Sequence, residues 1–140
     1  MARNVLLETS IIVAFERGVL RPADVVQPGD SLAISAITAA ELLVAPELAP
    51  ADRAPAKRQK IGDVLALHDI VDYDLPVARV HALLMAHARR NGQPRGSLDL
   101  AIAATAVASR RLLITTDVKA KLSDLPGLDV EVVTGSTSRS

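Results

Sequence analysis

The sequence predicts an α/β fold in which a central parallel sheet of four to five strands carries helices on both faces. Short runs of β-branched and aliphatic residues alternate along the chain with longer segments whose apolar residues repeat at helical spacing, as is typical of right-handed β-α-β units. Hydrophobic residues make up 49% of the chain, but there is only one Phe, one Tyr and no Trp. We therefore expect an aliphatic, Ala-rich core with helices packed close to the sheet.

Each element follows from a local pattern. Strands are expected over residues 5–7, 32–34, 70–73, 112–115 and 130–133. Helices are expected over residues 9–17, from 35 to a break between Pro46 and Pro55, and over 57–68, 76–90 and 98–108, with a short turn of helix near 119–123. We expect residues 1–133 to form a single domain and the small, polar segment 134–140 to be a disordered tail.

Hydroxyl residues stand at three expected helix starts. The pair Thr9-Ser10 can cap the first helix, Ser35 opens the helix after the second strand, and Ser97 is a good N-cap for the regular helix that follows it.

Composition excludes several classes of function. The sixteen acidic and sixteen basic residues balance, so no field of the whole protein attracts nucleic acid or anionic lipid, and a polyanion would need a local basic patch. The chain has no Cys, which removes thiolate chemistry and zinc-thiolate sites and fits a reducing compartment. No signal-peptide pattern and no apolar run of about 18 residues is present. We therefore expect a cytoplasmic protein without a membrane partner.

Four acids fall where the expected topology brings segments together. Glu8 follows the first strand, Glu41 lies in the helix after the second, Asp99 lies in the first turn of the Ala-rich helix, and Asp117 follows the fourth strand. Open α/β sheets bind ligands at the carboxyl ends of their strands. Converging carboxylates repel one another unless a cation lies among them, and oxygen-only ligands favour Mg²⁺ or Mn²⁺ over zinc. A metal held this way activates water and neutralises charge on a phosphate, so phosphodiester hydrolysis is the best-suited reaction.

Each acid also has a purely structural interpretation. Glu41, three residues after Thr38, can complete a capping box. Asp99 can simply complement the helix dipole. Asp117 can cap the next turn, and Glu8 can be a solvated strand end. The conjunction of the four positions, more than any one of them, carries the functional hypothesis.

Four stretches of sequence extend this hypothesis: LLETSII at 6–12, ITAAEL at 37–42, GSLDLAIAATA at 96–106 and LITTD at 113–117. In this order they resemble the acidic motifs of PIN-domain ribonucleases, and most closely those of VapC-type toxins from bacterial VapBC toxin–antitoxin pairs. The resemblance covers nearly the whole chain. It implies a PIN-like three-layer fold, a magnesium- or manganese-dependent endoribonuclease, a homodimer, and inhibition by a cognate VapB-type antitoxin in a hetero-oligomer.

The resemblance also implies roles for individual residues. Glu8, Asp99 and Asp117 would hold the metal, and Glu41 would bind it through water or position the nucleophile. The hydroxyl residues Thr9, Ser10 and Thr116 match positions that support the acids by hydrogen bonds, as metal sites commonly require.

Two positions depart from the family pattern. Glu8 stands where members overwhelmingly carry Asp, and its extra methylene moves the carboxylate by about 1.5 Å, a displacement that can lower a rate roughly a hundredfold. Members often carry a further acid two residues after the Asp117 position, where this chain has Lys119.

Basic residues form two groups. Arg89, Arg90 and Arg95 precede Asp99 and are our candidates for binding substrate phosphates. The other group is interpreted as a solvated helix face and contains Arg53, Lys57, Arg58 and Lys60. We interpret the three histidines as surface or interface residues, and they are His68, His81 and His87.

The leading hypothesis is thus a toxin ribonuclease that cuts a structured RNA such as tRNA or ribosomal RNA. An alternative is a catalytically silent PIN domain that binds a partner, with Glu8 as the sign of lost activity. A phosphotransfer receiver is a weaker alternative, because Asp72 and Asp74 do not supply the central acid that it needs after the third strand.

Overall fold

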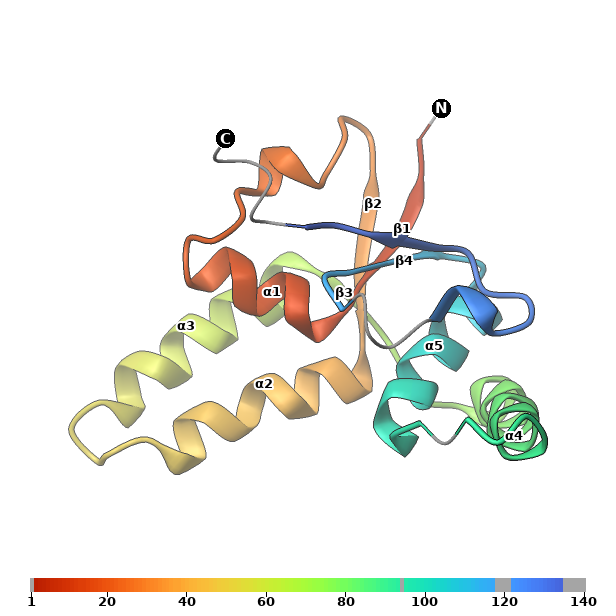
Figure 1. Ribbon diagram of the computed structural model, residues 1–140. Helices are drawn as coiled ribbons and strands as arrows, with labels where there is room; N and C mark the ends of the chain where they lie inside the picture. The colour runs from red at the N-terminus through yellow and green to blue at the C-terminus, as the bar shows by residue number, and fades with distance from the viewer. Residues whose placement is uncertain (1, 94, 118–121, 135–140) are drawn as a thin grey trace.

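The computed structural model of the chain describes residues 2–93, 95–117 and 122–134 (Figure 1). The five strands are β1 (Asn4–Leu7), β2 (Ser31–Ser35), β3 (Asp69–Val71), β4 (Leu112–Thr115) and β5 (Val130–Val132). They form one sheet in the order β3-β2-β1-β4-β5, and every neighbouring pair is parallel. The predicted parallel sheet is confirmed, with β1 at its centre.

Five α-helices connect the strands. They are α1 (Thr9–Glu16), α2 (Ala36–Leu48), α3 (Ala54–Leu67), α4 (Leu75–Arg90) and α5 (Ser97–Ser109). Two short 3-10 turns lie at Pro22–Asp24 and Leu122–Asp124. The helical turn expected near 119–123 falls largely outside the described residues, and so does the tail after Thr134. In the described part of the chain, no helix combines the length and the apolar character that a membrane crossing requires.

The core consists of two aliphatic layers separated by the sheet. Side chains of a strand alternate between its faces, so Leu6 packs with residues of α4 and α5, whereas Val5 and Leu7 pack with residues of α1, α2 and α3. These three side chains are fully buried, and burying each one stabilises the fold by roughly 1.5–3 kcal/mol. Figure 1 shows α1 and α5 on opposite sides of the strands. The three-layer prediction is confirmed.

Helix α5 lies close to the sheet because its buried face is built mostly from alanine. Ala101, Ala103, Ala104 and Ala106 are at most 2% exposed, and their small side chains let the helix axis approach the strands. This close packing carries Asp99, one turn before the buried alanines, towards the carboxyl edge of the sheet.

Two of the three expected helix caps are wrong. Ser35 caps α2 as expected, accepting a 2.9 Å hydrogen bond from the backbone amide of Thr38. Helix α5, however, begins at Ser97 with Gly96 as its N-cap, and α1 has Glu8 as its N-cap with no side-chain cap bond. The hydroxyls of the Thr9-Ser10 pair bond to carboxylates instead.

Helix α2 continues through Pro46 and ends at Leu48, and α3 begins at Ala54, so the break expected between Pro46 and Pro55 is confirmed. One histidine differs from expectation. His81 is 7% exposed on the face of α4 that also buries Val77 and Leu84, so its interpretation as a surface residue is wrong. Its Nδ1 atom lies 2.8 Å from the hydroxyl of Tyr73.

An ion pair joins the amino end of β1 to the turn before β2. The guanidinium of Arg3 contacts both carboxylate oxygens of Asp30, at 3.0 and 2.6 Å. Asp30 also accepts a 2.8 Å hydrogen bond from the amide of Gln27. The hydrogen bond from Arg3 is the main cause that lowers the pKa of Asp30 to about 2.

Asp30→Asn is therefore expected to destabilise the protein at neutral pH by about 1–3 kcal/mol, the usual loss when one partner of a charged hydrogen bond is removed. The folded-state pKa lies below the unfolded value, so this stabilisation is present above about pH 4 and disappears as the pH falls through about 2. Urea unfolding of both proteins at pH 7 and pH 3 measures it. A stability difference that does not shrink at pH 3 would contradict the electrostatic explanation.

Candidate active site

The parallel register brings Glu8 and Asp117 to one edge of the sheet. Leu7 of β1 pairs with Ile114 of β4, and the amide of Glu8 donates a 2.9 Å hydrogen bond to the carbonyl of Ile114. Asp99 reaches the same place from the first turn of α5, because a small cavity is lined by all three acids together with Thr115 and aliphatic residues. Three of the four predicted acids therefore share one cavity.

Two hydroxyl groups hold the carboxylate of Glu8. Its Oε1 atom accepts hydrogen bonds from Ser10 at 2.5 Å and from Thr115 at 2.8 Å. Each hydroxyl in turn accepts a 3.0 Å bond from a backbone amide beyond β4: Ser10 from Thr116 and Thr115 from Asp117. The conformation of Glu8 is thus coupled to the segment that carries Asp117.

The fourth acid, Glu41, is held by α1. The hydroxyl of Thr9 donates a 2.6 Å hydrogen bond to Oε1 of Glu41 and lies 3.0 Å from the hydroxyl of Thr38. Because Ser35 is the N-cap of α2, the alternative interpretation of Thr38 and Glu41 as a capping box is wrong. Glu41 does not line the small cavity but a larger neighbouring pocket between α1, α2 and α3.

Electrostatics connect all four acids. Burial raises the pKa of the Asp99 carboxyl above its usual range, and the negative charges of Glu8, Glu41 and Asp117 raise it further, in that order. Asp99 also lies in the first turn of α5, where the helix dipole favours its negative charge. The raised pKa shows that burial and the neighbouring negative charges together outweigh this local benefit.

The donor set of the cavity suits a hard cation. The cavity is lined by carboxylates and a hydroxyl and by no His or Cys side chain, the combination that Mg²⁺ and Mn²⁺ prefer. Glu8, Asp99 and Asp117 are the residues that would hold the ion. Within the described ranges, no group of three or more His, Cys, Asp or Glu side chains lies close enough together to hold a metal ion. Binding would therefore draw the carboxylates closer together while relieving their repulsion.

The supporting hydroxyls are only partly those expected. Thr9 and Ser10 bond directly to acids, as expected, whereas the recorded bond of Thr116 comes from its backbone amide. Thr115 and Thr38 were missed as supporting residues. Leu7 pairs with Ile114 in the strand register, so the next residues along the two chains, Glu8 and Thr115, lie side by side. Only this register reveals Thr115 as a supporting residue.

The basic candidates separate into two places. Arg89 and Arg95 line one pocket at the start of α5, and Arg90 does not. Lys57 and Lys60, interpreted from sequence as a solvated face, line the pocket beside Glu41 together with Arg17. Arg17, the C-cap residue of α1, was missed.

Asp99→Asn is expected to raise the melting temperature of the metal-free protein at pH 7, since it removes a repelled charge. A folded-state pKa above the unfolded value means that stability is greatest below the unfolded pKa, near 3.8, and falls as the pH rises through the folded pKa. The gain should therefore vanish below about pH 4. Thermal unfolding in EDTA at pH 7 and pH 3.5 measures it, and a lower melting temperature for the variant at pH 7 would contradict the repulsion.

Several solved structures share the fold of this chain. The structure is similar to a chain of VapBC2 from Rickettsia felis bound to a promoter DNA fragment, with TM-score 0.82, 22% identity, and 93% and 98% of the two chains covered. It is similar to a chain of VapBC-5 from Mycobacterium tuberculosis, with TM-score 0.73, 25% identity, and coverages of 94% and 98%. It is also similar to a chain of FitAcB from Neisseria gonorrhoeae, with TM-score 0.74, 26% identity, and coverages of 93% and 96%.

Among curated proteins, no sequence match is found. The family model described as PIN domain matches residues 5–126. These residues include the four candidate acids and every strand except Asn4 of β1 and the whole of β5. With the family model spanning most of the sequence and the fold shared over more than nine-tenths of the chain, the protein belongs to the PIN-domain family.

Proposed function

We propose that this chain is a metal-dependent endoribonuclease and the toxin of a type II toxin–antitoxin pair, acting in the cytoplasm on a structured RNA such as tRNA or ribosomal RNA. PIN domains are generally nucleases, so membership of the family by itself indicates a nuclease. The observation that carries the proposal is the cavity at the carboxyl edge of the sheet that Glu8, Asp99 and Asp117 line together. Acids that repel one another at the ligand-binding edge of a sheet are best explained by a cation that they bind.

The residues divide the chemistry among them. Glu8, Asp99 and Asp117 would hold a Mg²⁺ or Mn²⁺ ion, which supplies an activated water and neutralises charge on the phosphate when it is bound. Ser10 and Thr115 keep Oε1 of Glu8 in place. Thr9 orients Glu41, whose carboxylate would bind the ion through water or position the attacking water. Arg89, Arg90 and Arg95 remain proposed contacts for substrate phosphates.

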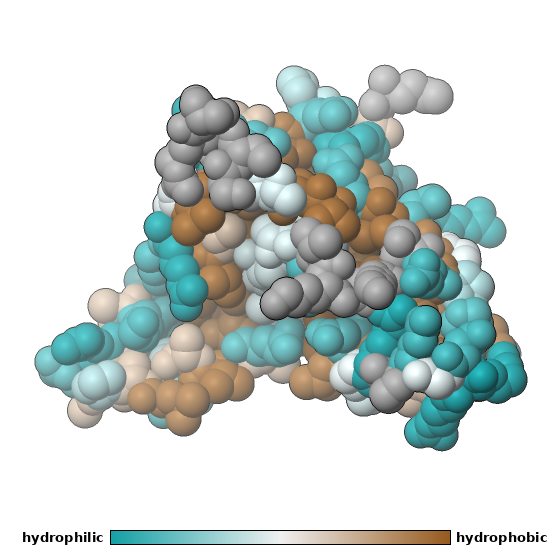
Figure 2. Space-filling model, viewed as in Figure 1, coloured by the Kyte–Doolittle hydropathy of each residue, from teal (hydrophilic) through white to brown (hydrophobic). Residues whose placement is uncertain are grey.

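The partner proposal rests on the neighbours and on an exposed apolar surface. Of the similar structures above, VapBC-5 from Mycobacterium tuberculosis is described as a member of the VapBC family of toxin-antitoxin systems, and VapBC2 from Rickettsia felis shares the VapBC name. Here Leu43, Val44 and Leu48 of α2 are 43–80% exposed, and Figure 2 shows apolar side chains gathered over this helix. Such patches mark protein interfaces. We propose a VapB-type antitoxin and a second copy of the chain as partners in a hetero-oligomer.

Glu8 favours one alternative, a catalytically impaired PIN domain that acts as an antitoxin- or RNA-binding module. Its side chain is one methylene longer than the Asp of the family pattern, which moves the carboxylate by about 1.5 Å. This displacement would weaken metal binding.

Activity separates the two functions. We expect purified protein to cleave total RNA in Mg²⁺ or Mn²⁺ and to stop in EDTA, and we expect Glu8→Asp to cut faster by up to about a hundredfold, because a carboxylate displacement of about 1.5 Å has effects of that size. Glu8→Gln serves as the control that removes the charge at nearly constant shape. If neither the natural chain nor Glu8→Asp cuts any RNA, and calorimetry detects no metal binding, the enzyme is excluded.

Asp99→Asn is expected to abolish both Mn²⁺ binding and cleavage while the fold is retained, because it removes a ligand charge without changing the side-chain volume. Asp63→Asn is the matched control, since Asp63 bonds to Gln59 on exposed α3, away from the acids. Calorimetric titration with Mn²⁺ and circular dichroism measure binding and folding. Unchanged Mn²⁺ affinity in Asp99→Asn would refute the ligand assignment.

A further inference from the structure

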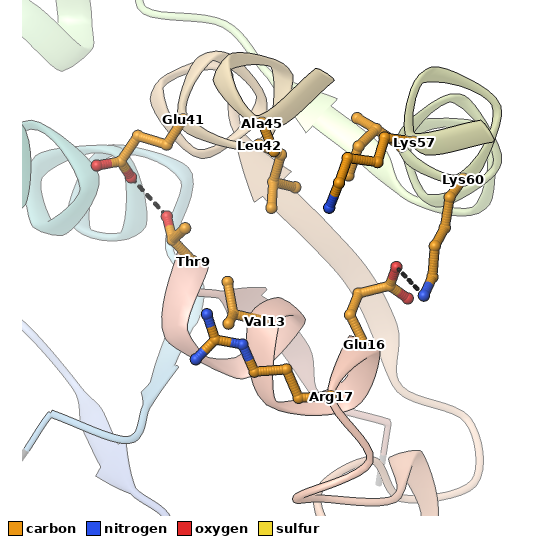
Figure 3. Close-up of a pocket in the computed structure, with 10 residues that line it drawn as sticks. Thr9, Val13, Glu16, Arg17, Glu41, Leu42, Ala45, Lys57 and Lys60 are labelled. Atoms are coloured by element: carbon orange, nitrogen blue, oxygen red, sulfur yellow. Dashed lines mark hydrogen bonds and ion pairs between the residues drawn. The ribbon is translucent and has the colours of Figure 1, made fainter. Parts of the chain in front are cut away.

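A pocket of about 380 Å³ lies beside Glu41, between α1, α2 and α3 (Figure 3). This volume lies within the range of about 300–1,000 Å³ typical of ligand pockets. Its floor is aliphatic and its rim is charged, with Val13, Leu42 and Ile61 inside and Arg17, Lys57 and Lys60 around them. It therefore offers apolar surface and positive charge to the same ligand.

The pocket joins the candidate active site at Glu41. This acid lines the pocket and accepts a hydrogen bond from Thr9, the residue next to Glu8, which lines the small acidic cavity. A chain-like ligand lying in the pocket would thus continue directly towards the acids.

Two of the three cations on the rim are available to a ligand. Lys60 pairs with Glu16 at 3.4 Å. Among the interactions of the described residues, no ion pair or side-chain hydrogen bond involves Arg17 or Lys57, and both are exposed. In Figure 3 the ammonium group of Lys57 points into the space between the helices, and the side chain of Arg17 extends beneath Val13. Two unpaired positive charges therefore face an apolar floor.

We propose that this pocket is a nucleotide subsite for single-stranded RNA, with phosphates bound by Arg17 and Lys57 and one unstacked base seated on the aliphatic floor. The proposal rests on the proposed nuclease function. It adds phosphate contacts on a different face of the protein from Arg89, Arg90 and Arg95. Charge favours RNA over a peptide: the lining has three cations, Arg17, Lys57 and Lys60, against the two acids Glu16 and Glu41, and Glu16 is already paired with Lys60. A guanidinium and a point-like ammonium both suit phosphates.

The test measures binding without catalysis. A short fluorescein-labelled single-stranded RNA of mixed sequence is titrated by fluorescence anisotropy in EDTA over a range of salt concentrations. We expect the double variant Arg17→Gln/Lys57→Gln to reduce the slope of log K against log salt by about 1.4, because each phosphate contact to a single strand contributes about 0.7, which is roughly 25-fold in affinity at 0.1 M salt. The matched control Arg58→Gln/Arg79→Gln also loses two exposed charges, one from α3 and one from α4, and should bind as the natural chain does.

A second pair of variants tests the floor without changing charge. Ala45→Phe fills the pocket from α2 and should weaken RNA binding, whereas Ala82→Phe, at an exposed position of α4 outside the pocket, should not. Circular dichroism and thermal unfolding confirm that all four variants fold.

Each result decides the proposal. If the two double charge variants lose RNA affinity equally, the effect is general electrostatics and the proposal is wrong. If the pocket variants keep the RNA affinity of the natural chain, the pocket does not bind RNA and the proposal is also wrong. If RNA binding depends on Arg17 and Lys57 but no protein cleaves RNA in Mg²⁺ or Mn²⁺, the subsite stands and the nuclease function fails. If cleavage occurs and the pocket variants bind and cut normally, the nuclease stands and the subsite is wrong.

Discussion

Repulsion among carboxylates at one edge of a parallel sheet is the constraint around which this molecule is organised. Parallel strands all end at the same edge, so residues from distant parts of the sequence meet there. In this chain Glu8 and Asp117 follow neighbouring strands, and Asp99 lines the same cavity. Burial and the charges of the neighbouring acids raise the pKa of Asp99, and perturbed carboxylates of this kind are characteristic of functional sites.

The surrounding structure restrains the acids without neutralising them. Neutral hydroxyls bond to Glu8 and Glu41, and the ion pairs recorded among the described residues involve neither of them. Hydroxyl groups orient a carboxylate while leaving its charge available, whereas an arginine would have competed with a metal. The buried hydroxyls of Thr38 and Thr115 thus connect the rigid core to the chemistry, as preorganised sites require.

Glu41 connects two regions with different tasks. On one side lies the small acidic cavity, and on the other lies the larger pocket with its aliphatic floor and basic rim. Thr9, at the start of α1, touches Glu41, and Arg17 follows immediately after the end of the same helix. Helix α1 therefore spans the distance between the acids and the unpaired cations, which gives one short element a role in both regions.

The sequence by itself determined the order of strands and helices, the parallel sheet and the positions of four acids near its carboxyl edge. These features follow from local periodicity and from topology, which neighbouring residues encode. It did not determine that α5 starts at Ser97, that His81 is buried, or that Thr115 supports Glu8. Only the tertiary structure decided these points, and it also placed Arg17 and Lys57 on one pocket. The physical reason is that strand register and helix packing depend on contacts between residues far apart in the chain, whose effect no local pattern records.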